Sequence, residues 1–258
     1  GFSHTNKGHW NLLHLPVLPV TGNVSSGDYA STYSHSNESA RPGYYQVFLE
    51  RYGVNAELTS TLRCAYHKYT FRPDDDKKVL VDITRTNNGV RDWSIQKVDD
   101  YTFSGNQDAE GNIRFYAVSN YKIEDIRQLK DGEHEVSVVS FADSKGSKPL
   151  ELKIGFSFVS IDNAKMNLEQ EMKDKSFVQV RKEADKTWEN LLSKIEVTGG
   201  TEREKGIFYS CLYRSFLWPA LRSDVNGEYT DAKGNVVING FRYYTDPSFW
   251  DDYRIKLI

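Results

Sequence analysis

A short stretch near the C-terminus combines three side-chain types that bind sugars. It reads Trp250-Asp-Asp-Tyr253-Arg254. A Trp ring stacks on the apolar face of a pyranose, while carboxylate and guanidinium groups hydrogen-bond its hydroxyls. The same residues also allow a structural interpretation, in which Trp250 packs in a helix or strand and Asp251 pairs locally with Arg254. The stretch is therefore a candidate sugar site that its spacing alone does not decide.

Histidines near the N-terminus are the next candidates for chemistry. His4, His9 and His14 recur every five residues, a spacing that suits neither a helix face nor a strand face. No Cys or clustered carboxylate accompanies them, so we predict no transition-metal site here. Trp10 in the same segment is a candidate sugar platform, with packing as the alternative. His67 lies in a strand-like run, and we expect it to be structural, because a general base needs a partner and a cleft.

Acidic residues are too numerous to point to a catalytic pair. The chain contains 36 of them, so finding two together would prove nothing. The run PDDDKK, residues 73–78, lacks the alternating Asp spacing and the Gly of a calcium-binding loop. We predict that it forms a solvated turn.

Composition excludes several classes of protein. A chain of 258 residues can form one large domain or two, and 38% hydrophobic residues suffice for a packed core. The net charge of −3 argues against a nucleic-acid partner. No apolar run approaches the ~20 residues of a membrane span, and no leader sequence is visible. Both ends look cut, so we expect a fragment of a longer protein. Two cysteines are expected to be free thiols.

The first part of the chain is predicted to be an antiparallel β-sandwich over residues 1–159. Aromatic and β-branched runs form a meander at 44–49, 56–62 and 66–71, with alternation that places one face on a core and one toward water. A proline-interrupted edge strand precedes it at 15–20. Turn signals at short intervals predict nine to eleven strands in all. The later ones are expected at 79–83, 93–98, 101–104, 113–118, 134–141 and 150–159.

Beyond Ser160 the apolar period changes from two to 3.6. Ser160 is a good N-cap, and capping-box patterns follow at Ser176 with Gln179 and at Thr201 with Glu204. We therefore predict helices over 160–219. Residues 220–258 return to turns and short strands, with an exposed hairpin expected between 236–238 and 241–244.

Four phrases together resemble glycoside hydrolase family 92, the calcium-dependent exo-acting α-mannosidases. The chain begins GFSHT, which resembles that phrase of the family. SHSNESARPGYYQV (34–47) with AELTSTLRCAYHKYTF (56–71) resembles its N-terminal β-sandwich. IEVTGGTEREKGIFYSCLYRSFLWP (195–219) resembles the entry to its helical part, and DPSFWDDYR (246–254) resembles its W-D-x-[YF]-R phrase.

The resemblance implies a fold and a site. The sandwich would be followed by linker helices and, at 220–258, by the start of a truncated (α/α)6 catalytic barrel. Asp251 matches the family's substrate-binding Asp and Arg254 its Arg, so Trp250, Asp251, Arg254 and Trp10 are the expected substrate-binding residues. The resemblance places no catalytic residue in this chain, and it implies Ca²⁺ with ligands mostly outside it. The segment NKGHWNLLH, which follows GFSHT, departs from the family's usual sequence. Substrate contacts that the family makes from this loop are therefore not assigned to this chain.

The implied activity is calcium-assisted hydrolysis of terminal α-linked mannose, with inversion and an expected α-1,2 specificity. The chain would supply one wall of the pocket, and alone it is expected to be inactive. Its partners would be mannose-containing glycans and the missing C-terminal catalytic domain. The protein would be secreted, periplasmic or located at the cell surface. One alternative is a non-catalytic carbohydrate-binding β-sandwich, which exposed aromatics on a sheet face would favour. Another is a purely structural sandwich whose apolar helix faces meet a protein partner.

Overall fold

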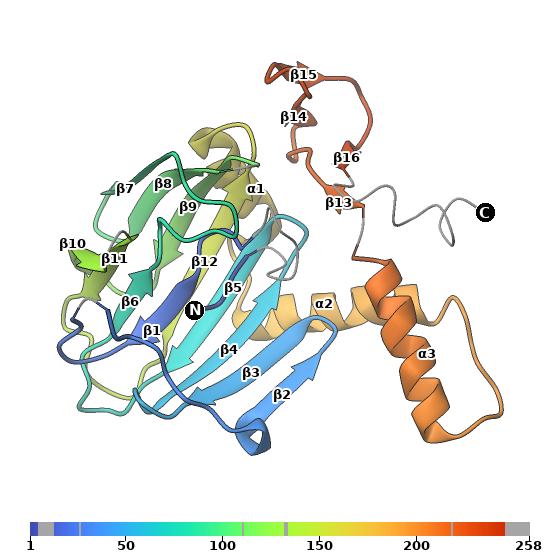
Figure 1. The fold of residues 1–258 in the computed structure, drawn as a ribbon, viewed down its shortest axis with the longest axis horizontal. Helices are drawn as coiled ribbons and strands as arrows, with labels where there is room; N and C mark the ends of the chain where they lie inside the picture. Colours follow the sequence, from blue (N-terminus) through green and yellow to red (C-terminus); the bar gives the residue numbers. More distant parts are fainter. Residues whose placement is uncertain (5–12, 26, 110, 132–133, 218, 246–258) are drawn as a thin grey trace.

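Two antiparallel sheets face each other in the first part of the molecule (Figure 1). The computed structural model describes residues 1–4, 13–25, 27–109, 111–131, 134–217 and 219–245. One sheet has four strands in the order β1-β6-β11-β10, and the other has eight in the order β2-β3-β4-β5-β12-β9-β8-β7. The predicted class, a β-sandwich followed by helices, is therefore confirmed.

The strands of the sandwich are short and joined mostly by tight turns. They are β1 (Val17–Val20), β2 (Glu38–Arg41), β3 (Tyr44–Leu49), β4 (Val54–Ser60), β5 (Cys64–Thr70), β6 (Lys78–Val81), β7 (Asp92–Lys97), β8 (Thr102–Asp108), β9 (Ile113–Ser119), β10 (Ile123–Asp131), β11 (His134–Phe141) and β12 (Leu150–Ser157).

The core of the sandwich lies between the two sheets. Aliphatic side chains from the small sheet pack there against residues of the central strands of the large sheet. Its fully buried members include Val20, Val54, Val79, Phe115, Val139, Leu150 and Leu152.

Two helices cover the outer face of the large sheet. Helix α1 (Ile161–Met172) packs on β12 and β9, and α2 (Phe177–Leu192) packs on β4 and β5. Gly155 of β12 lets α1 approach closely, because a Cβ built at that position would lie 2.2 Å from the carbonyl oxygen of Ala164. A second apolar cluster fills this interface, formed by Tyr44, Cys64, Tyr66, Leu168, Met172, Phe177 and Val180.

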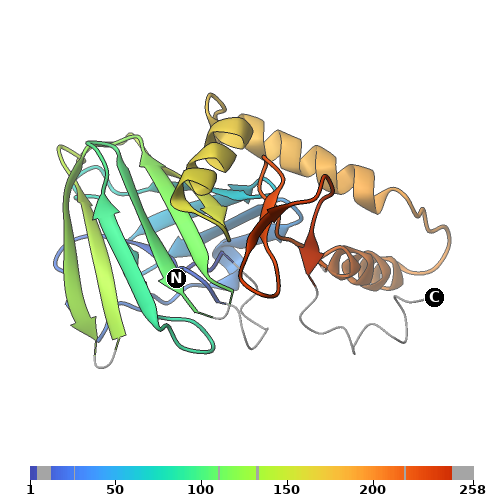
Figure 2. The same ribbon diagram turned by 90° about the horizontal axis from the view of Figure 1, so that it is seen from above.

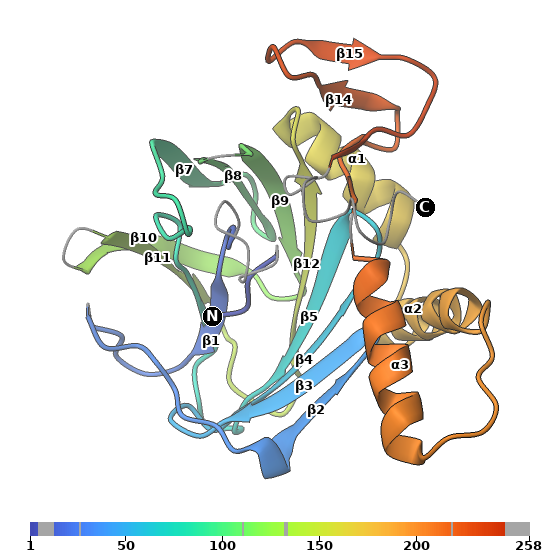
Figure 3. The ribbon, with the colours of Figure 1, turned by 45° about the vertical axis from the view of Figure 1, so that its right-hand side comes forward.

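Helix α3 (Glu202–Ser215) and four short strands complete the described chain. The strands are β13 (Ala220–Leu221), β14 (Glu228–Thr230), β15 (Val236–Ile238) and β16 (Tyr244–Thr245). Figures 2 and 3 show β14 and β15 beside α1, so residues far apart in the sequence meet at this end of the sandwich. No helix among the described residues is long and apolar enough to cross a membrane.

Four expectations from the sequence are wrong. The described part of the sandwich has twelve strands rather than nine to eleven, because the polar edge strands β2 and β10 were not predicted. The expected alternation of buried and solvated faces fails in β4: the polar residue Thr59 is buried, and Leu62, the last apolar residue of the predicted strand 56–62, is 67% exposed just beyond the observed strand. Lys77, expected in a solvated turn, is buried.

The predicted C-terminal hairpin also has the wrong partner strand. β15 pairs with β14, not with residues 241–244, and β16 pairs with β13. The reason is the turn at Asp231, whose carboxylate accepts hydrogen bonds from the backbone N–H groups of Lys233 and Asn235, each at 2.8 Å. This turn joins β14 to β15 directly.

We expect Gly155→Ala to destabilise the protein by about 1–3 kcal/mol, because the new methyl group would force α1 away from β12. Thermal unfolding of the two proteins measures the effect. Gly206→Ala is the control, since a Cβ at that site in α3 meets no atom within 4 Å and Ala favours helix. Equal melting temperatures for Gly155→Ala and the unchanged protein would contradict the close packing.

Candidate functional site

The first residues of the chain are fixed to the sandwich by paired hydrogen bonds. Phe2 and Val17 exchange backbone hydrogen bonds of 2.7 and 3.0 Å, and the N–H of His4 donates to the carbonyl of His14 at 3.1 Å. His4 thereby reaches the large sheet, where its Nε2 lies 3.2 Å from Nε2 of His67. His67 in turn contacts the hydroxyl of Tyr69 through Nδ1 at 2.5 Å.

These contacts fit one arrangement of neutral tautomers. A carbonyl can only accept, so His4 Nδ1 donates to the Leu15 carbonyl at 2.7 Å. His4 Nε2 then accepts from His67 Nε2, and His67 Nδ1 accepts from the Tyr69 hydroxyl. Burial lowers the pKa of His4 to about 4, although the Leu15 hydrogen bond opposes this shift. Burial, and then repulsion from His4 when that ring is protonated, holds the pKa of His67 well below its usual value. His67 is therefore a satisfied structural residue, as the sequence predicted.

The far end of the segment that follows His4 is also fixed. Leu13 and Leu15 both have left-handed backbone conformations, with φ of 73° and 45°, which are strained for Leu. The N–H of Leu15 donates to Gln107 Oε1 at 2.9 Å, and Gln107 Nε2 donates to the Ile83 carbonyl at 2.6 Å. The fully buried Gln107 thus holds the strained turn against the sandwich.

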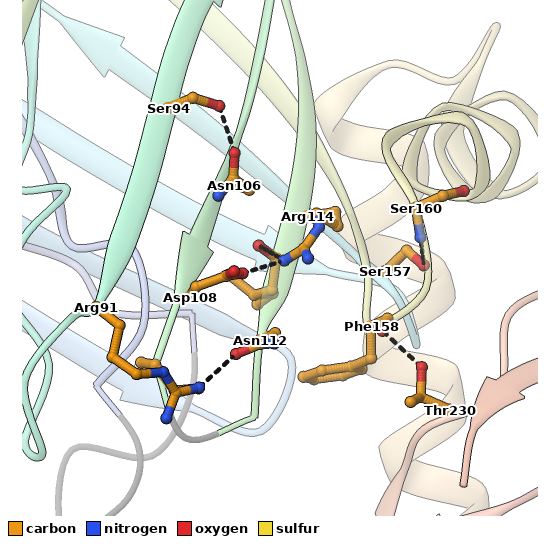
Figure 4. A network of polar contacts seen from close by, with 12 residues as sticks. Arg91, Ser94, Asn106, Asp108, Asn112, Arg114, Ser157, Phe158, Ser160 and Thr230 are labelled. Carbon is orange, nitrogen blue, oxygen red and sulfur yellow. Dashed lines mark hydrogen bonds and ion pairs between the residues drawn. The ribbon is translucent and has the colours of Figure 1, made fainter. Parts of the chain in front are cut away.

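A cleft of about 820 Å³ separates the end of the sandwich from the C-terminal strands. Arg91, Asn112 and Arg114 line it from the sandwich, and Arg222, Thr230 and Thr245 line it from the opposite side. Phe158, just after β12, lies between the two sides. Figure 4 shows its ring extending toward Asn112, while its carbonyl accepts a 2.9 Å hydrogen bond from the Thr230 hydroxyl.

A buried carboxylate connects the C-terminal strands to the sandwich. Asp224 accepts hydrogen bonds from Ser157 (2.6 Å), Asn163 (2.8 Å) and Asn167 (2.7 Å). Asn167 completes the link, because its Oδ1 accepts from the N–H of Val225 at 2.9 Å. Burial raises the pKa of Asp224, and the three donors oppose that shift. The end of β12, helix α1 and the C-terminal strands thus share one polar network.

A second polar contact lies nearby. The Arg63 guanidinium donates to Glu171 of α1 at 2.8 Å and, through Nε, to the Ser223 carbonyl at 2.8 Å. Glu171 also accepts from the hydroxyl of Thr61 and the backbone N–H of Arg63. The two networks hold residues 223–225 from both sides.

The four residues predicted to bind substrate lie outside the described residues. These are Trp10, Trp250, Asp251 and Arg254. The described residues on either side show where their segments attach: Trp10 follows His4 and precedes Leu13, and the segment with Trp250 follows Thr245 in the cleft lining.

Sequence reasoning did not single out Gln107, Phe158, Arg222 or Asp224. Each stands alone, without a motif around it. Their roles depend on contacts with residues distant in the sequence: Gln107 contacts Leu15 across 92 positions, and Asp224 contacts Asn163 across 61. No local signal could have identified them.

In the described part of the chain, no three or more His, Cys, Asp or Glu side chains come together as a metal site. The predicted Ca²⁺ remains a prediction. Both cysteines are free, Cys64 buried and Cys211 exposed.

Comparison with known families covers nearly the whole chain. Residues 1–157 match the glycosyl hydrolase family 92 N-terminal domain, and residues 163–257 match the glycosyl hydrolase family 92 catalytic domain. The chain belongs to glycoside hydrolase family 92. The resemblance seen in the sequence is confirmed, and the cleft lies between the parts of the chain that these two models match.

Solved structures of family 92 enzymes have the same fold. An α-mannosidase from Bacteroides thetaiotaomicron is 27% identical with a TM-score of 0.86, over 94% of this chain and 37% of that enzyme. Its complex with mannoimidazole matches at 28% identity with a TM-score of 0.85, covering 94% of this chain and 36% of the enzyme. An uncharacterized secreted glycosidase of Arthroderma benhamiae is 24% identical across 88% of this chain and 36% of its own length. This family 92 chain thus spans about a third of the length of the relatives it matches.

Asp224→Ala should weaken the attachment of the C-terminal strands, because it leaves three buried donors without their acceptor. We expect a loss of about 2–4 kcal/mol in unfolding free energy and faster amide hydrogen exchange in residues 219–245. Asp174→Ala, at an exposed position, is the control. Unchanged exchange in 219–245 would contradict the role assigned to Asp224.

The histidine contacts predict a pH dependence of stability. A His whose pKa is lowered on folding takes up a proton on unfolding, so its stabilising effect is complete above about pH 6.5 and is lost as the pH falls toward 4. We expect the melting temperature of the unchanged protein to fall more steeply across this range than that of His4→Phe, which cannot titrate. His35→Gln, at an exposed histidine, should keep the steep dependence. Equal slopes for the protein and His4→Phe would contradict this account.

Proposed function

We propose that this family 92 chain forms part of an exo-acting glycosidase that removes terminal α-linked mannose. The proposal rests on the cleft between the sandwich and the C-terminal strands. It is supported by the fold, which matches that of an α-mannosidase over 94% of the chain. The mannoimidazole complex of one such neighbour supports a mannose-like ligand. The secreted glycosidase among the relatives supports secretion or display at the cell surface.

The proposed mechanism is hydrolysis with inversion, preferably of α-1,2 linkages. Inversion needs an acid and a base about 6.5–9.5 Å apart, with a water between the base and the sugar. Among the described residues that line the cleft, only Asp231 carries a carboxylate, and the backbone of its own turn occupies it. We therefore expect the catalytic pair to come from residues outside this described lining, with this chain supplying one wall of the pocket.

We assign substrate binding to Trp250, Asp251, Arg254 and Trp10. Trp250 would stack on the sugar ring, and Asp251 and Arg254 would bind its hydroxyls. Trp10 would act from the segment that His4 and Leu13 attach to the sandwich. Ca²⁺ is proposed for the whole enzyme, where it would polarise sugar hydroxyls, with its ligands mostly outside this chain.

A carbohydrate-binding sandwich without catalysis is the weaker candidate. It requires aromatic side chains exposed on a sheet face. Among the described residues, no exposed large aromatic lies in a strand of either sheet of the sandwich. The exposed ones, Tyr33, Tyr101, Phe216, Phe241 and Tyr244, lie in connections and in β16.

The full-length enzyme should hydrolyse α-1,2-mannobiose faster than the α-1,3 and α-1,4 isomers, with β-mannose as the first product seen by NMR. A calcium chelator should abolish the activity, and added Ca²⁺ should restore it. We expect Asp251→Ala to reduce kcat/KM by at least about 100-fold, because a charge-assisted contact is lost at the reacting sugar. Residues 1–258 alone should show no hydrolysis.

Each part of the proposal can fail separately. α-Mannose as the first product would contradict inversion, and activity in the presence of chelator would contradict the role of calcium. Hydrolysis by residues 1–258 alone would show that the catalytic carboxylates are in this chain. Titration of mannose into residues 1–258 tests the alternative: binding that is independent of calcium and unchanged in Asp251→Ala would support a carbohydrate-binding module.

A further inference from the structure

A second depression, the outer groove, lies on the outer face of the large sheet beside the last turns of α1. Its volume is about 340 Å³, within the range of small-molecule sites. Strands β5, β12 and β9 form its floor, and α1 forms a wall that includes Glu169 and Lys173. The cleft adjoins the opposite end of α1, where Asn163 binds Asp224. The 12 residues of α1 put roughly 18 Å between its two ends, so the outer groove is separate from the cleft.

Lys153 fixes the place where α1 ends and the outer groove begins. Its ammonium donates to the carbonyls of Met172 at 2.9 Å, Lys173 at 3.2 Å and Lys175 at 2.8 Å. Carbonyls at a helix end lack partners within the helix, so these contacts stabilise the end of α1. The chain then turns toward α2, which packs on β4 and β5. Strands β12 and β9 therefore carry no helix beyond the last turn of α1, and the floor stays open.

Glu151 is a half-buried carboxylate in this floor, and it has no ion pair with a described residue. Its Oε2 accepts from the Tyr66 hydroxyl at 2.7 Å. Lys68 lies opposite Glu151 in the register of β5 and β12, but it pairs instead with Glu57 at 2.9 Å. No described residue donates to Oε1 of Glu151. A carboxylate oxygen that lacks a donor favours a ligand that offers hydroxyl groups.

Tyr116 and Val118 of β9 supply apolar surface beside Glu151. Both side chains are half-buried on the outer face of the sheet, where they pack against the apolar cluster under the helices. Lys165 of α1 approaches the Tyr116 ring, with Nζ 5.8 Å from the ring centre. The Tyr116 hydroxyl has no hydrogen-bond partner among the described residues. This side chain thus offers an apolar ring and an unused polar group to the same ligand.

The charges of the described lining balance each other. Glu151 and Glu169 are negative, and Lys153 and Lys173 are positive. Lys153 is bound to the end of α1, whereas neither Glu169 nor Lys173 forms an ion pair with a described residue. A lining of this kind gives no net attraction to a strongly charged ligand. Charge complementarity therefore favours a ligand that is polar but neutral.

We propose that the outer groove is a second glycan-binding site, which takes a neutral pyranose of a glycan away from the cleft. A pyranose has an apolar face for Tyr116 and Val118, and its hydroxyl groups can donate to Glu151. Such a site raises the concentration of a long glycan near the cleft without taking part in hydrolysis. Binding in the outer groove does not depend on the proposed mannosidase activity. Only the choice of α-mannan as a probe rests on that function.

Affinity electrophoresis of the full-length enzyme tests the site. The native gels contain α-mannan, dextran or polygalacturonate, and the loss of mobility gives an apparent dissociation constant. We expect α-mannan to retard the enzyme and the acidic polymer to leave its mobility unchanged. Tyr116→Leu and Glu151→Gln should each raise the constant for α-mannan at least about threefold, because one loses the aromatic contact and the other replaces a hydrogen-bond acceptor by a donor.

Matched controls separate the outer groove from the rest of the surface. Tyr33→Leu changes a tyrosine that is 50% exposed outside the groove, and Glu124→Gln changes an exposed glutamate of β10. Both variants should be retarded like the unchanged enzyme. All four variants should hydrolyse mannobiose at the unchanged rate, since the outer groove is apart from the cleft. Retained hydrolysis also distinguishes this site from a carbohydrate-binding module without catalysis.

Each outcome bears on the proposal. Retardation by dextran alone supports a neutral-glycan site for a sugar other than mannose. Retardation by neither neutral polymer, or equally by polygalacturonate, overturns the proposal. Retardation that is unaltered in Tyr116→Leu and Glu151→Gln also overturns it, because binding would then lie elsewhere. If Tyr116→Leu does not fold, Glu151→Gln alone must weaken the retardation, and its failure to do so has the same meaning. Failure of the mannosidase proposal would appear instead as no hydrolysis of mannobiose, with retardation intact.

Discussion

The large sheet has to be covered on both faces, and the rest of the structure follows from this requirement. Its inner face is buried against the small sheet, and its outer face carries apolar side chains that would otherwise meet water. Helices α1 and α2 cover that outer face, with α1 drawn onto β12 at Gly155. The covering helices therefore belong to the sandwich physically, although the family's catalytic-domain model matches from residue 163.

The position of α1 decides where the cleft forms. Because α1 begins just after β12, its first turns lie beside Phe158 and present Asn163 and Asn167 to the C-terminal strands. Asp224 binds there, and the chain between Arg222 and Thr245 then forms the opposite wall. At the other end of the sequence, the histidine contacts and Gln107 attach the N-terminal segment to the same sandwich. Both segments expected to contact sugar thus adjoin residues that are hydrogen-bonded to the sandwich or to α1.

Local physics was enough to predict most of the fold. The meander around 44–71, the three helix starts and the sandwich class follow from alternation, capping residues and turn signals, all of which are properties of neighbouring residues. Edge strands β2 and β10 were not predicted because their sequences, ESAR and IEDIRQLKD, are polar and lack the apolar alternation of a strand that covers a core. Polar residues of this kind are common in strands at the edge of a sheet. The partner of β15 was predicted wrongly because a turn could form on either side of this strand, and the Asp231 carboxylate stabilises the turn that precedes it.

The site could not be predicted in the same way, because Arg222, Gln107 and Asp224 acquire their roles only through partners distant in the sequence. Trp10, Trp250, Asp251 and Arg254 were named from local motifs and family phrases, and they remain predictions.

The Asp224 network also has a consequence for synthesis on the ribosome. Its three donors belong to residues 157–167, whereas the acceptor follows 57 to 67 residues later. At translation rates of about 5–20 residues per second, the donors emerge roughly 3–13 s before their partner. During that interval Ser157, Asn163 and Asn167 are polar groups that water can satisfy, so the nascent sandwich presents a hydrated surface rather than an adhesive apolar one. At this junction the sandwich therefore exposes polar groups while the rest of the chain is being made, and the cleft cannot form until residues 222–245 have been synthesised.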